Sequence, residues 1–246
     1  MSHYDAHLLP RLIGTTVTTY DDASWTWVIT KKLSEKVAPM TETDVKMRRG
    51  FSKTVGKFLC HLEGRPDRQA FMRIYYQIPI VGTEDADVEI LAQQAVPPPV
   101  CGELESFKLL RGCSAVPRFL GHAEKTQGEH DLVPGGYIRY VVWEKVPGES
   151  LTEEFFWGLD RSIRDDIREK FRAALQQILS RGTEPGWASI SKIIYDQPTG
   201  NLHISGFRQR WPIISALKWS ESEYVNYDLA EIHEEEDWFH PEKWEW

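Results

Sequence analysis

The sequence predicts an α+β fold in which a β-rich N-terminal half precedes a helical C-terminal half. Two observations place strands in the first half: a pair of β-rich runs at 53–63 and 69–79, and a third apolar run at 137–143. A third observation places helix in the second half, where apolar residues recur at helical spacing between 160 and 182. Strands followed by helices, rather than alternating with them, are typical of the α+β class.

The composition is that of an ordinary globular protein. The chain has 246 residues, 41% of them hydrophobic, which suffices for one large domain or two small lobes around a shared cleft. A formal net charge of -8 and the lack of a dense basic stripe argue against a nucleic-acid partner. The three cysteines are widely spaced and odd in number, as is typical of reduced thiols. The sequence shows no secretory signal or membrane-spanning run, so we expect a cytoplasmic protein without a membrane partner.

The first elements predicted are a strand and a hairpin. Residues 25–37 (WTWVITKKLSEKV) suggest a strand that runs into a short helix, and residues 41–49 suggest a polar connector. The β-rich runs at 53–63 and 69–79 flank Gly-Arg-Pro-Asp, which has the composition of a tight reverse turn. The two runs therefore predict a β-hairpin.

The middle of the chain combines a long loop with two short elements. Residues 81–102 are polar, acidic and proline-rich, which predicts a loop insertion. After this loop, Leu104 and Phe107 lie at helical spacing, and Gly112 is suited to ending the helix. The run at 137–143 then predicts a buried strand that leads into an exposed turn.

The most regular pattern in the sequence is a long amphipathic helix in the C-terminal half. Asp160 is suited to its N-cap and Gly182 to its C-terminal end. The residues expected on its buried face are Ile163, Ile167, Phe171, Ala174 and Ile178. Further on, short apolar runs at 193–195 and 202–204 flank Asp-Gln-Pro-Thr-Gly, which predicts a second hairpin.

Three segments resemble a known family: ELESFKLL, VPGGYIRYVVWEKVPGESL and KIIYDQPTGNLHISGF. They are similar to degenerate fungal proteins related to the aminoglycoside and choline phosphotransferases, over residues 69–230. The resemblance implies a protein-kinase-like fold with two lobes and a small-molecule ligand in the cleft between them. The parts that it implies are a β-rich N-terminal lobe at 1–142, a hinge at 143–150, and a shortened helical C-terminal lobe at 151–246 with an acidic, Trp-rich tail.

The resemblance also implies roles for charged residues of the first lobe. In kinase-type proteins a lysine on the third strand holds the phosphates, and a helix carboxylate holds that lysine. Arg73 takes the place of the lysine and Glu103 that of the carboxylate, with Glu105 as the rival. An arginine still binds phosphate, although through its planar, forked guanidinium rather than through the compact ammonium of a lysine. The hinge residues implied to contact the ligand, as they contact adenine in the family, are Trp143, Glu144 and Val146.

The catalytic loop departs from the family pattern. Family members carry His-Gly-Asp, then an Asn, and a metal-binding Asp after the hairpin. By resemblance, Trp187 stands at the proton-accepting Asp, Lys192 at the metal-binding Asn, and Gly206 at the second metal-binding position. An indole and an ammonium do not ligate metals. The resemblance therefore predicts no metal site, no firm cofactor, and the loss of ordinary magnesium-dependent transfer from ATP.

Other groups near this loop leave alternatives open. Asp196 or Glu184 is near enough in sequence to replace a lost carboxylate. His203 lies close to Gly206 and points either into the cleft or out of it. The histidines and cysteines of the chain show no zinc-type or catalytic spacing. The tryptophans of the acidic tail after Glu231 need burial, and packing on their own domain is favoured over a protein partner.

Three functions are compatible with these residues. The favoured one is a pseudokinase, a kinase-fold protein that has lost phosphotransfer and binds a nucleotide or other small molecule or regulates another protein. The second is a metal-free enzyme of natural-product metabolism, such as a cyclase or isomerase, with Lys192 and His203 among its charge-stabilising and acid–base groups. The third is an unorthodox active phosphotransferase that uses Asp196 or Glu184.

Overall fold

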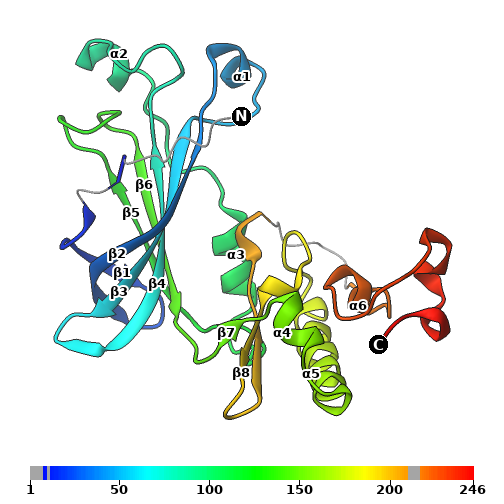
Figure 1. The fold of residues 1–246 in the computed structure, drawn as a ribbon. Helices are drawn as coiled ribbons and strands as arrows, with labels where there is room; N and C mark the ends of the chain where they lie inside the picture. Colours follow the sequence, from blue (N-terminus) through cyan, green and yellow to red (C-terminus); the bar gives the residue numbers. More distant parts are fainter. Residues whose placement is uncertain (1–7, 10–11, 210–216) are drawn as a thin grey trace. The chain divides into compact units, whose positions relative to one another are not determined.

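The structure, a computed structural model, divides into two compact units (Figure 1). The described residues are 8–9, 12–209 and 217–246. Unit 1 comprises the described residues of 1–100 and 120–145, and unit 2 comprises those of 101–119 and 146–246. The chain thus passes from one unit to the other three times, and the third passage lies between Lys145 and Val146.

Unit 1 is built on a closed barrel with the strand order β1-β2-β3-β4-β6-β5. The strands are β1 (Thr16–Tyr20), β2 (Ser24–Ala38), β3 (Lys53–Leu62), β4 (Arg65–Gln77), β5 (Phe119–Thr126) and β6 (Tyr137–Glu144). The pairings from β1 to β4, and that of β4 with β6, are antiparallel. Figure 1 shows these strands wound around a common interior. The hairpin predicted between 53 and 79 is confirmed as β3 and β4, and the strand predicted at 137–143 is confirmed as β6.

The core of unit 1 fills the interior of the barrel. Strand alternation decides which residues point inward, because successive side chains lie on opposite faces of a strand. On β4 the buried core residues are Ala70, Met72, Ile74 and Tyr76. Arg73 and its neighbours Phe71 and Tyr75 therefore lie on the outer face of the barrel.

The prediction of a helix after the first strand is wrong. Residues 25–37 belong to β2, which continues without a break to Ala38. The strand keeps its pairing with β3 across two register irregularities, one between Ile29 and Lys31 and one between Lys32 and Ser34. Bulges of this kind add residues to one strand and bend it. The polar residues that suggested a helix are thus accommodated by two bulges.

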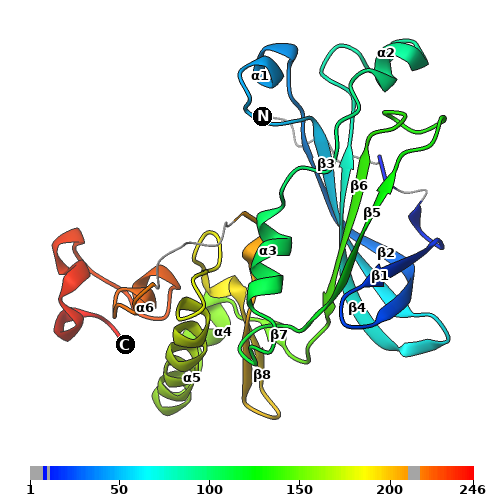
Figure 2. The same ribbon diagram turned by 180° about the vertical axis from the view of Figure 1, so that it is seen from behind.

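Two segments expected to be irregular contain short helices. The connector at 41–49 includes α1 (Glu42–Lys46), which begins at a capping box formed by Thr41 and Asp44. The insertion at 81–102 includes α2 (Val88–Ala92). In both views α1 and α2 lie at the same end of the barrel (Figures 1 and 2), where the Val81 N–H donates to the Met40 carbonyl at 3.0 Å.

Unit 2 is mainly helical and includes a small sheet. Its helices are α3 (Gly102–Leu109), α4 (Glu153–Trp157), α5 (Arg161–Leu179) and α6 (Glu223–Asn226). Its 3-10 turns are η2 (Ile190–Lys192), η3 (Phe207–Gln209), η4 (Glu235–Phe239) and η5 (Pro241–Lys243). The sheet has the order β7-β8-β9, formed by β7 (Glu149–Ser150), β8 (Ile193–Asp196) and β9 (Asn201–Ile204). Figure 2 shows α3 beside the segment that follows β9, and the predicted second hairpin is confirmed as β8 and β9.

Helix α5 confirms the long amphipathic helix and its start directly after Asp160. Ile167, Phe171 and Ile178 are fully buried in the core of unit 2. Ile163 was expected on the same face but is 39% exposed. It lies in the first turn of the helix, ahead of the turns that pack against the core. Among the described helices, none has the length and apolar character of a membrane span.

The acidic tail packs against unit 2, as favoured from the sequence. Trp244 is buried in the core of this unit, and Trp246 packs against the same core. The Trp244 Nε1 donates to the Asp237 carbonyl at 2.7 Å, and the Trp246 Nε1 donates to the Pro241 carbonyl at 3.0 Å. Both indole N–H groups are thus satisfied inside the tail, and the apolar faces of the rings are left for the core.

Candidate functional site

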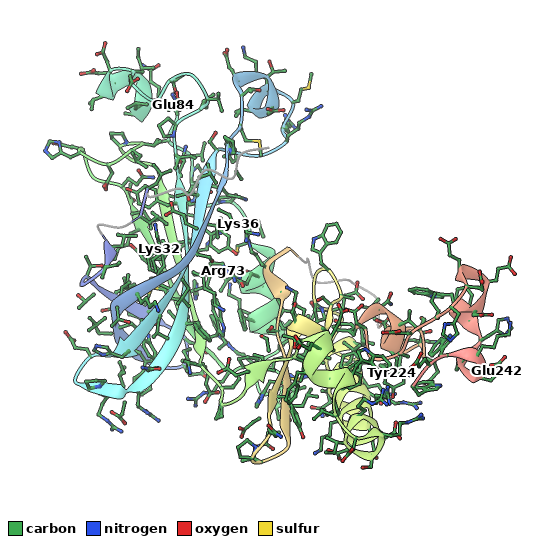
Figure 3. All side chains as sticks on the ribbon, in the orientation of Figure 1. Lys32, Lys36, Arg73, Glu84, Tyr224 and Glu242 are labelled. Atoms are coloured by element: carbon green, nitrogen blue, oxygen red, sulfur yellow. The ribbon has the colours of Figure 1, made fainter. Side chains whose placement is uncertain are left out.

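Four side chains form a cation–aromatic cluster on the outer face of unit 1: Lys57, Phe71, Arg73 and Trp143. They come from the adjacent strands β3, β4 and β6, and Figure 3 labels Arg73 on β4. In the sheet register Lys57 lies opposite Arg73, and Phe71 lies opposite Trp143. Residues 71 and 73 share one face because they are two positions apart on a strand.

Each cation of the cluster lies over an aromatic ring. The Lys57 Nζ is 4.1 Å from the centroid of the Phe71 ring, and the Arg73 Cζ is 5.0 Å from a ring centroid of Trp143. The two rings are 6.1 Å apart. A cation over a ring contributes roughly 0.5–2 kcal/mol, depending on how far it is desolvated. These contacts hold both positive charges at defined places beside a planar apolar surface.

The pairing of Lys57 with Arg73 is electrostatically unfavourable on its own. Like charges directly opposite each other on neighbouring strands destabilise a sheet. Other groups of the protein also interact with Lys57 and Arg73. A guanidinium can bind a phosphate or carboxylate with two hydrogen bonds. The cation–aromatic cluster therefore has the chemistry for a ligand that joins a negative group to a flat ring.

Helix α3 places the two candidate glutamates in different surroundings. Glu103 is only 2% exposed. Glu105 lies on the other side of the first turn, is exposed in part, and accepts a hydrogen bond from the Lys108 Nζ at 3.0 Å. Burial thus distinguishes Glu103 from its rival. Glu103 belongs to unit 2 and Arg73 to unit 1, so their predicted pairing stays a prediction.

The residues predicted to contact a ligand from the hinge lie at the end of β6 and just after it. Trp143 is buried, and Glu144, half-buried, is the last residue of the strand. Val146 is buried and begins the segment 146–246 of unit 2. Contacts of Glu144 and Val146 with a ligand stay a prediction.

In unit 2 the structure brings together two segments that carry the predicted site residues Trp187, Lys192 and Gly206. The Gly186 N–H donates to the Gly206 carbonyl at 2.9 Å, so the residue before Trp187 lies beside the end of β9. The aliphatic stem of Lys192 crosses Gly206. A Cβ at position 206 would lie 2.9 Å from the Lys192 Cδ and 3.3 Å from its Cε. We call this meeting of residues 186–192 with 205–206 the junction.

Several hydrogen bonds hold the junction in place. The Ser205 N–H and Oγ both donate to the Lys192 carbonyl, at 2.9 and 3.1 Å. The Ile190 N–H donates to the Asp228 carboxylate at 3.2 Å, across 38 residues of sequence. Asp228 was not predicted from the sequence, because no local pattern links an acid so far along the chain to this loop.

Trp187 adopts an unusual backbone conformation within the loop. Its φ is 57°, in the left-handed region, which costs a residue with a Cβ roughly 1–2 kcal/mol. Its side chain is 78% exposed. Such strain persists only where surrounding structure enforces it, and it clusters at functional sites. The loop thus presents a large indole at the protein surface at an energetic cost.

The groups at the junction do not fit a divalent metal ion. Magnesium takes oxygen ligands in near-octahedral geometry, whereas Trp187, Lys192 and Gly206 supply an indole, an ammonium and no side chain. Throughout the described ranges, no three His, Cys, Asp or Glu residues are grouped so that they could hold a metal. His3 and His7 lie outside those ranges. We therefore derive no chemical step through a metal.

The two remaining candidates lie on the β8–β9 hairpin. Asp196 is at its turn, where its carboxylate accepts a hydrogen bond from the Thr199 hydroxyl. It is four residues from Lys192, or about 13 Å along an extended strand. His203 lies opposite Ile194 in the register, on the face away from buried Ile204. Asp196 thus has a turn contact already, and catalytic roles for both residues stay predictions.

Comparisons with known proteins leave the family unassigned. No protein-family profile matches the chain, and no curated protein sequence matches it. Among solved structures, the Cydia pomonella granulovirus kinase PK-1 is similar at 13% identity with a TM-score of 0.47; the match covers 87% of this chain and 75% of the kinase. What is established is a mixed fold of strands and helices, in which the strands are concentrated in unit 1.

Proposed function

We propose that this chain is a pseudokinase: a protein of kinase-like fold that binds a small anionic molecule with a planar ring, such as a nucleotide, without transferring phosphate. The observation that carries the proposal is the cation–aromatic cluster on the outer face of β3, β4 and β6. Two positive charges and two rings occur there within a few ångströms of one another. Ligand sites commonly combine apolar aromatic surface with a few well-placed polar groups.

The cluster supports binding by two complementary contacts. Half-buried Phe71 offers ring surface against which a base or another flat group can stack, and buried Trp143 lies next to it, with the ring centroids 6.1 Å apart. Lys57 and Arg73 carry positive charge that suits a phosphate or carboxylate. A ligand with only one of these features would gain only part of the available free energy. A nucleotide carries both.

The residues of unit 2 support binding without phosphotransfer. Transfer of a phosphoryl group relies on a base to orient the hydroxyl and on metal ions to neutralise charge. The positions expected to supply these groups are occupied by Trp187, Lys192 and Gly206. Restoring the reaction would need a new base and new metal ligands at once. We therefore favour a binding or regulatory role over turnover.

Thermal unfolding and calorimetry of the full chain with ATP, ADP and AMP, each with and without magnesium, test the proposal. A ligand that binds only the folded state raises the melting temperature. We expect ATP or ADP to raise it with no requirement for magnesium, and no release of phosphate. The substitution Arg73→Met should weaken binding about tenfold or more, which corresponds to about 1.4 kcal/mol.

A matched control lies on the same strand. Arg65 pairs with Asp67 at 3.1 Å at the exposed start of β4, away from the cation–aromatic cluster. Arg65→Met should leave nucleotide affinity unchanged within about twofold, a shift of less than about 0.5 kcal/mol. Absence of binding by every nucleotide, or equal losses in Arg65→Met and Arg73→Met, would overturn the binding role. Magnesium-dependent ATP turnover that Arg73→Met abolishes would overturn the loss of phosphotransfer.

A further inference from the structure

We propose that unit 2 contains an anion site of its own, centred on the Lys192 ammonium, which binds a phosphate or carboxylate group without a metal ion. This site is built from residues of unit 2 alone, whereas the cation–aromatic cluster is built from residues of unit 1, and its proposed ligand need not be a nucleotide. Three features of the junction lead to it: the way the Lys192 stem is held, the charge around its ammonium, and the rigidity of the surrounding backbone.

The Lys192 side chain is held against the main chain of Gly206. Its Cγ, Cδ and Cε would all lie within 3.3 Å of a Cβ at position 206, so only glycine leaves room for the stem. Lys192 is accordingly half-buried. A lysine that is free in solution loses conformational entropy when it binds a ligand, whereas one already held by its stem loses less. Gly206 thus pre-positions the ammonium.

Among the described residues, the Lys192 ammonium has no ion-pair partner. Within the described part of the chain, no ion pair or hydrogen bond engages its Nζ. Other lysines of the chain do have acidic partners. These pairs are Lys32 with Glu35, Lys46 with Glu42, Lys108 with Glu105, Lys170 with Asp166, and Lys243 with Asp237. Lys192 is therefore a positioned positive charge in a chain whose net charge is -8.

The backbone around this charge is fixed by hydrogen bonds. Ser205 holds the Lys192 carbonyl, Gly186 holds the Gly206 carbonyl, and Asp228 holds the 3-10 turn that leads into Lys192. A group that binds a ligand gains affinity when its frame is rigid, because less freedom is lost on binding. Trp187, five residues before Lys192, is exposed and has a strained backbone.

An ammonium selects its ligand by charge. It is a compact point charge with three donors, which suits phosphate and carboxylate oxygens. Since the charge is built into the chain, no divalent ion is needed to bring the anion there. A magnesium complex of the same anion is already partly neutralised and should bind more weakly. The attraction should also fall with ionic strength, because salt screens charges near the surface.

Isothermal calorimetry and NMR of the full chain with inorganic pyrophosphate or citrate, each without metal, test this proposal. We expect at least one of them to bind and to shift the amide signals of residues 186–192 and 205–206. Pyrophosphate alone would identify phosphate as the ligand group, and citrate alone would identify carboxylate. Lys192→Met should weaken the binding tenfold or more. In the native protein, magnesium added in excess over the anion should also weaken the binding.

Two variants serve as controls. Lys170→Met removes a lysine of the same unit that is already paired with Asp166 at 2.7 Å, and it should change the affinity less than twofold. Lys192→Arg keeps the charge and should retain most of the binding. Binding of neither anion, equal affinity in Lys192→Met and the native chain, or an absolute need for magnesium would overturn the proposal. None of these outcomes tests nucleotide binding by the cation–aromatic cluster. Conversely, an unchanged nucleotide affinity in Arg73→Met would not count against the Lys192 site.

Discussion

Arg168 and Lys192 are two cations of unit 2 in opposite situations. Arg168 is 4% exposed, donates to the Leu229 carbonyl at 2.7 Å and pairs with Asp165 at 2.7 Å. Its guanidinium also lies within 6 Å of aromatic rings on Phe156, Trp157 and Trp246. Lys192 is half-buried, and the described residues give its ammonium no carboxylate.

The charge of Arg168 is used inside the fold, whereas that of Lys192 remains available to a ligand. A buried cation is tolerated when hydrogen bonds, an opposite charge and polarisable rings replace the water it has lost. Arg168 has all three kinds of contact, although its Nη2 is buried without a hydrogen bond, and it links α5 to the tail. Lys192 is held only by its stem, so its charged end keeps the capacity to bind something else. Four predictions test whether the two cations differ in this way.

The largest expected effect is the loss of stability in Arg168→Met. Arg168→Met removes the hydrogen bond to Leu229 and the charge opposite Asp165. It also removes the cation over the rings of Phe156 and Trp246, whereas Trp157 keeps that of Arg164. Removing one member of a buried pair costs about 3–5 kcal/mol, and half-exposed Asp165 reduces this to roughly 2–4 kcal/mol. Urea denaturation measures the loss. Arg172→Met, which removes a surface pair with Glu221, should cost less than about 1 kcal/mol.

The expected contrast also includes ligand binding. Arg168→Met should leave the affinity of the Lys192 site for anions unchanged at temperatures where the variant is folded. Arg172 also lies over a ring, 5.4 Å from the centroid of Trp219. Equal destabilisation by Arg168→Met and Arg172→Met would therefore show that the burial and the buried hydrogen bonds of Arg168 add nothing. The distinction between the two cations would then be lost.

The second prediction concerns the glycine beneath Lys192. Gly206 has a φ of 106°, and an added Cβ would meet the Lys192 stem at 2.9 Å. Gly206→Ala should therefore destabilise the protein by roughly 1–3 kcal/mol. Urea denaturation of Gly206→Ala alone and combined with Lys192→Ala separates the two causes, because removing the stem relieves the steric part only.

Gly128 provides the control for this substitution. Its φ is not positive, and an added Cβ would lie 3.6 Å from the nearest atom, the Asp131 carboxylate. Gly128→Ala should change the free energy of unfolding by less than about 0.5 kcal/mol. If Gly206→Ala were as mild as Gly128→Ala, the Lys192 stem would not be confined by position 206, and the pre-positioning of the ammonium would have no basis.

Local pattern was sufficient to predict the elements that carry strong periodicity. Strands β3, β4 and β6 alternate or are continuously apolar, and α5 repeats apolar residues every three to four positions. Strands β1 and β5 were not predicted. The β5 segment FLGHAEKT is polar at its end, and β1 is only five residues long. Both are strands because they close the barrel, a tertiary effect that no local window contains.

The candidate sites could also be predicted from the sequence only in part. Resemblance located Arg73, Lys192 and Gly206 as altered positions, but not what surrounds them. The cation–aromatic cluster depends on the register that sets Lys57 opposite Arg73, and register follows from the pairing of whole strands. The contact of Asp228 with the loop spans 38 residues. Sequence could therefore name residues of the sites but not the neighbours that give them their chemistry.

The third prediction is a dependence on acid pH in the surroundings of Arg168. Burial by itself would raise the pKa of Asp165, but hydrogen bonds and charges from Arg161 and Arg168 outweigh it and hold the pKa below its usual value. The folded state therefore favours the carboxylate. The stability that it contributes is present above the unfolded-state pKa of about 3.9 and is lost as pH falls through the lower folded-state pKa.

Urea midpoints measured between pH 6 and pH 2.5 test this dependence. The native chain should lose stability below about pH 4 more steeply than Asp165→Asn, whose side chain does not titrate. The two curves should converge at the lowest pH, where Asp165 is protonated in both states. Parallel curves across this range would mean that Asp165 interacts equally with its arginines in the folded and unfolded chain. Asp165 could then not be counted as a stabilising partner of Arg168.

The smallest expected effect is that of Lys192→Met on stability. Methionine keeps an unbranched chain of the same length as far as the ε position, so the contact with Gly206 is preserved while the ammonium is removed. The described residues give that ammonium no ion pair to lose, and substitutions of this kind usually change the free energy of unfolding by less than about 0.5 kcal/mol. Urea denaturation at pH 7 and low salt measures the change. A loss above about 1 kcal/mol would make the ammonium part of the fold, like the guanidinium of Arg168, whereas a near-zero change together with lost anion binding would assign its charge to the ligand.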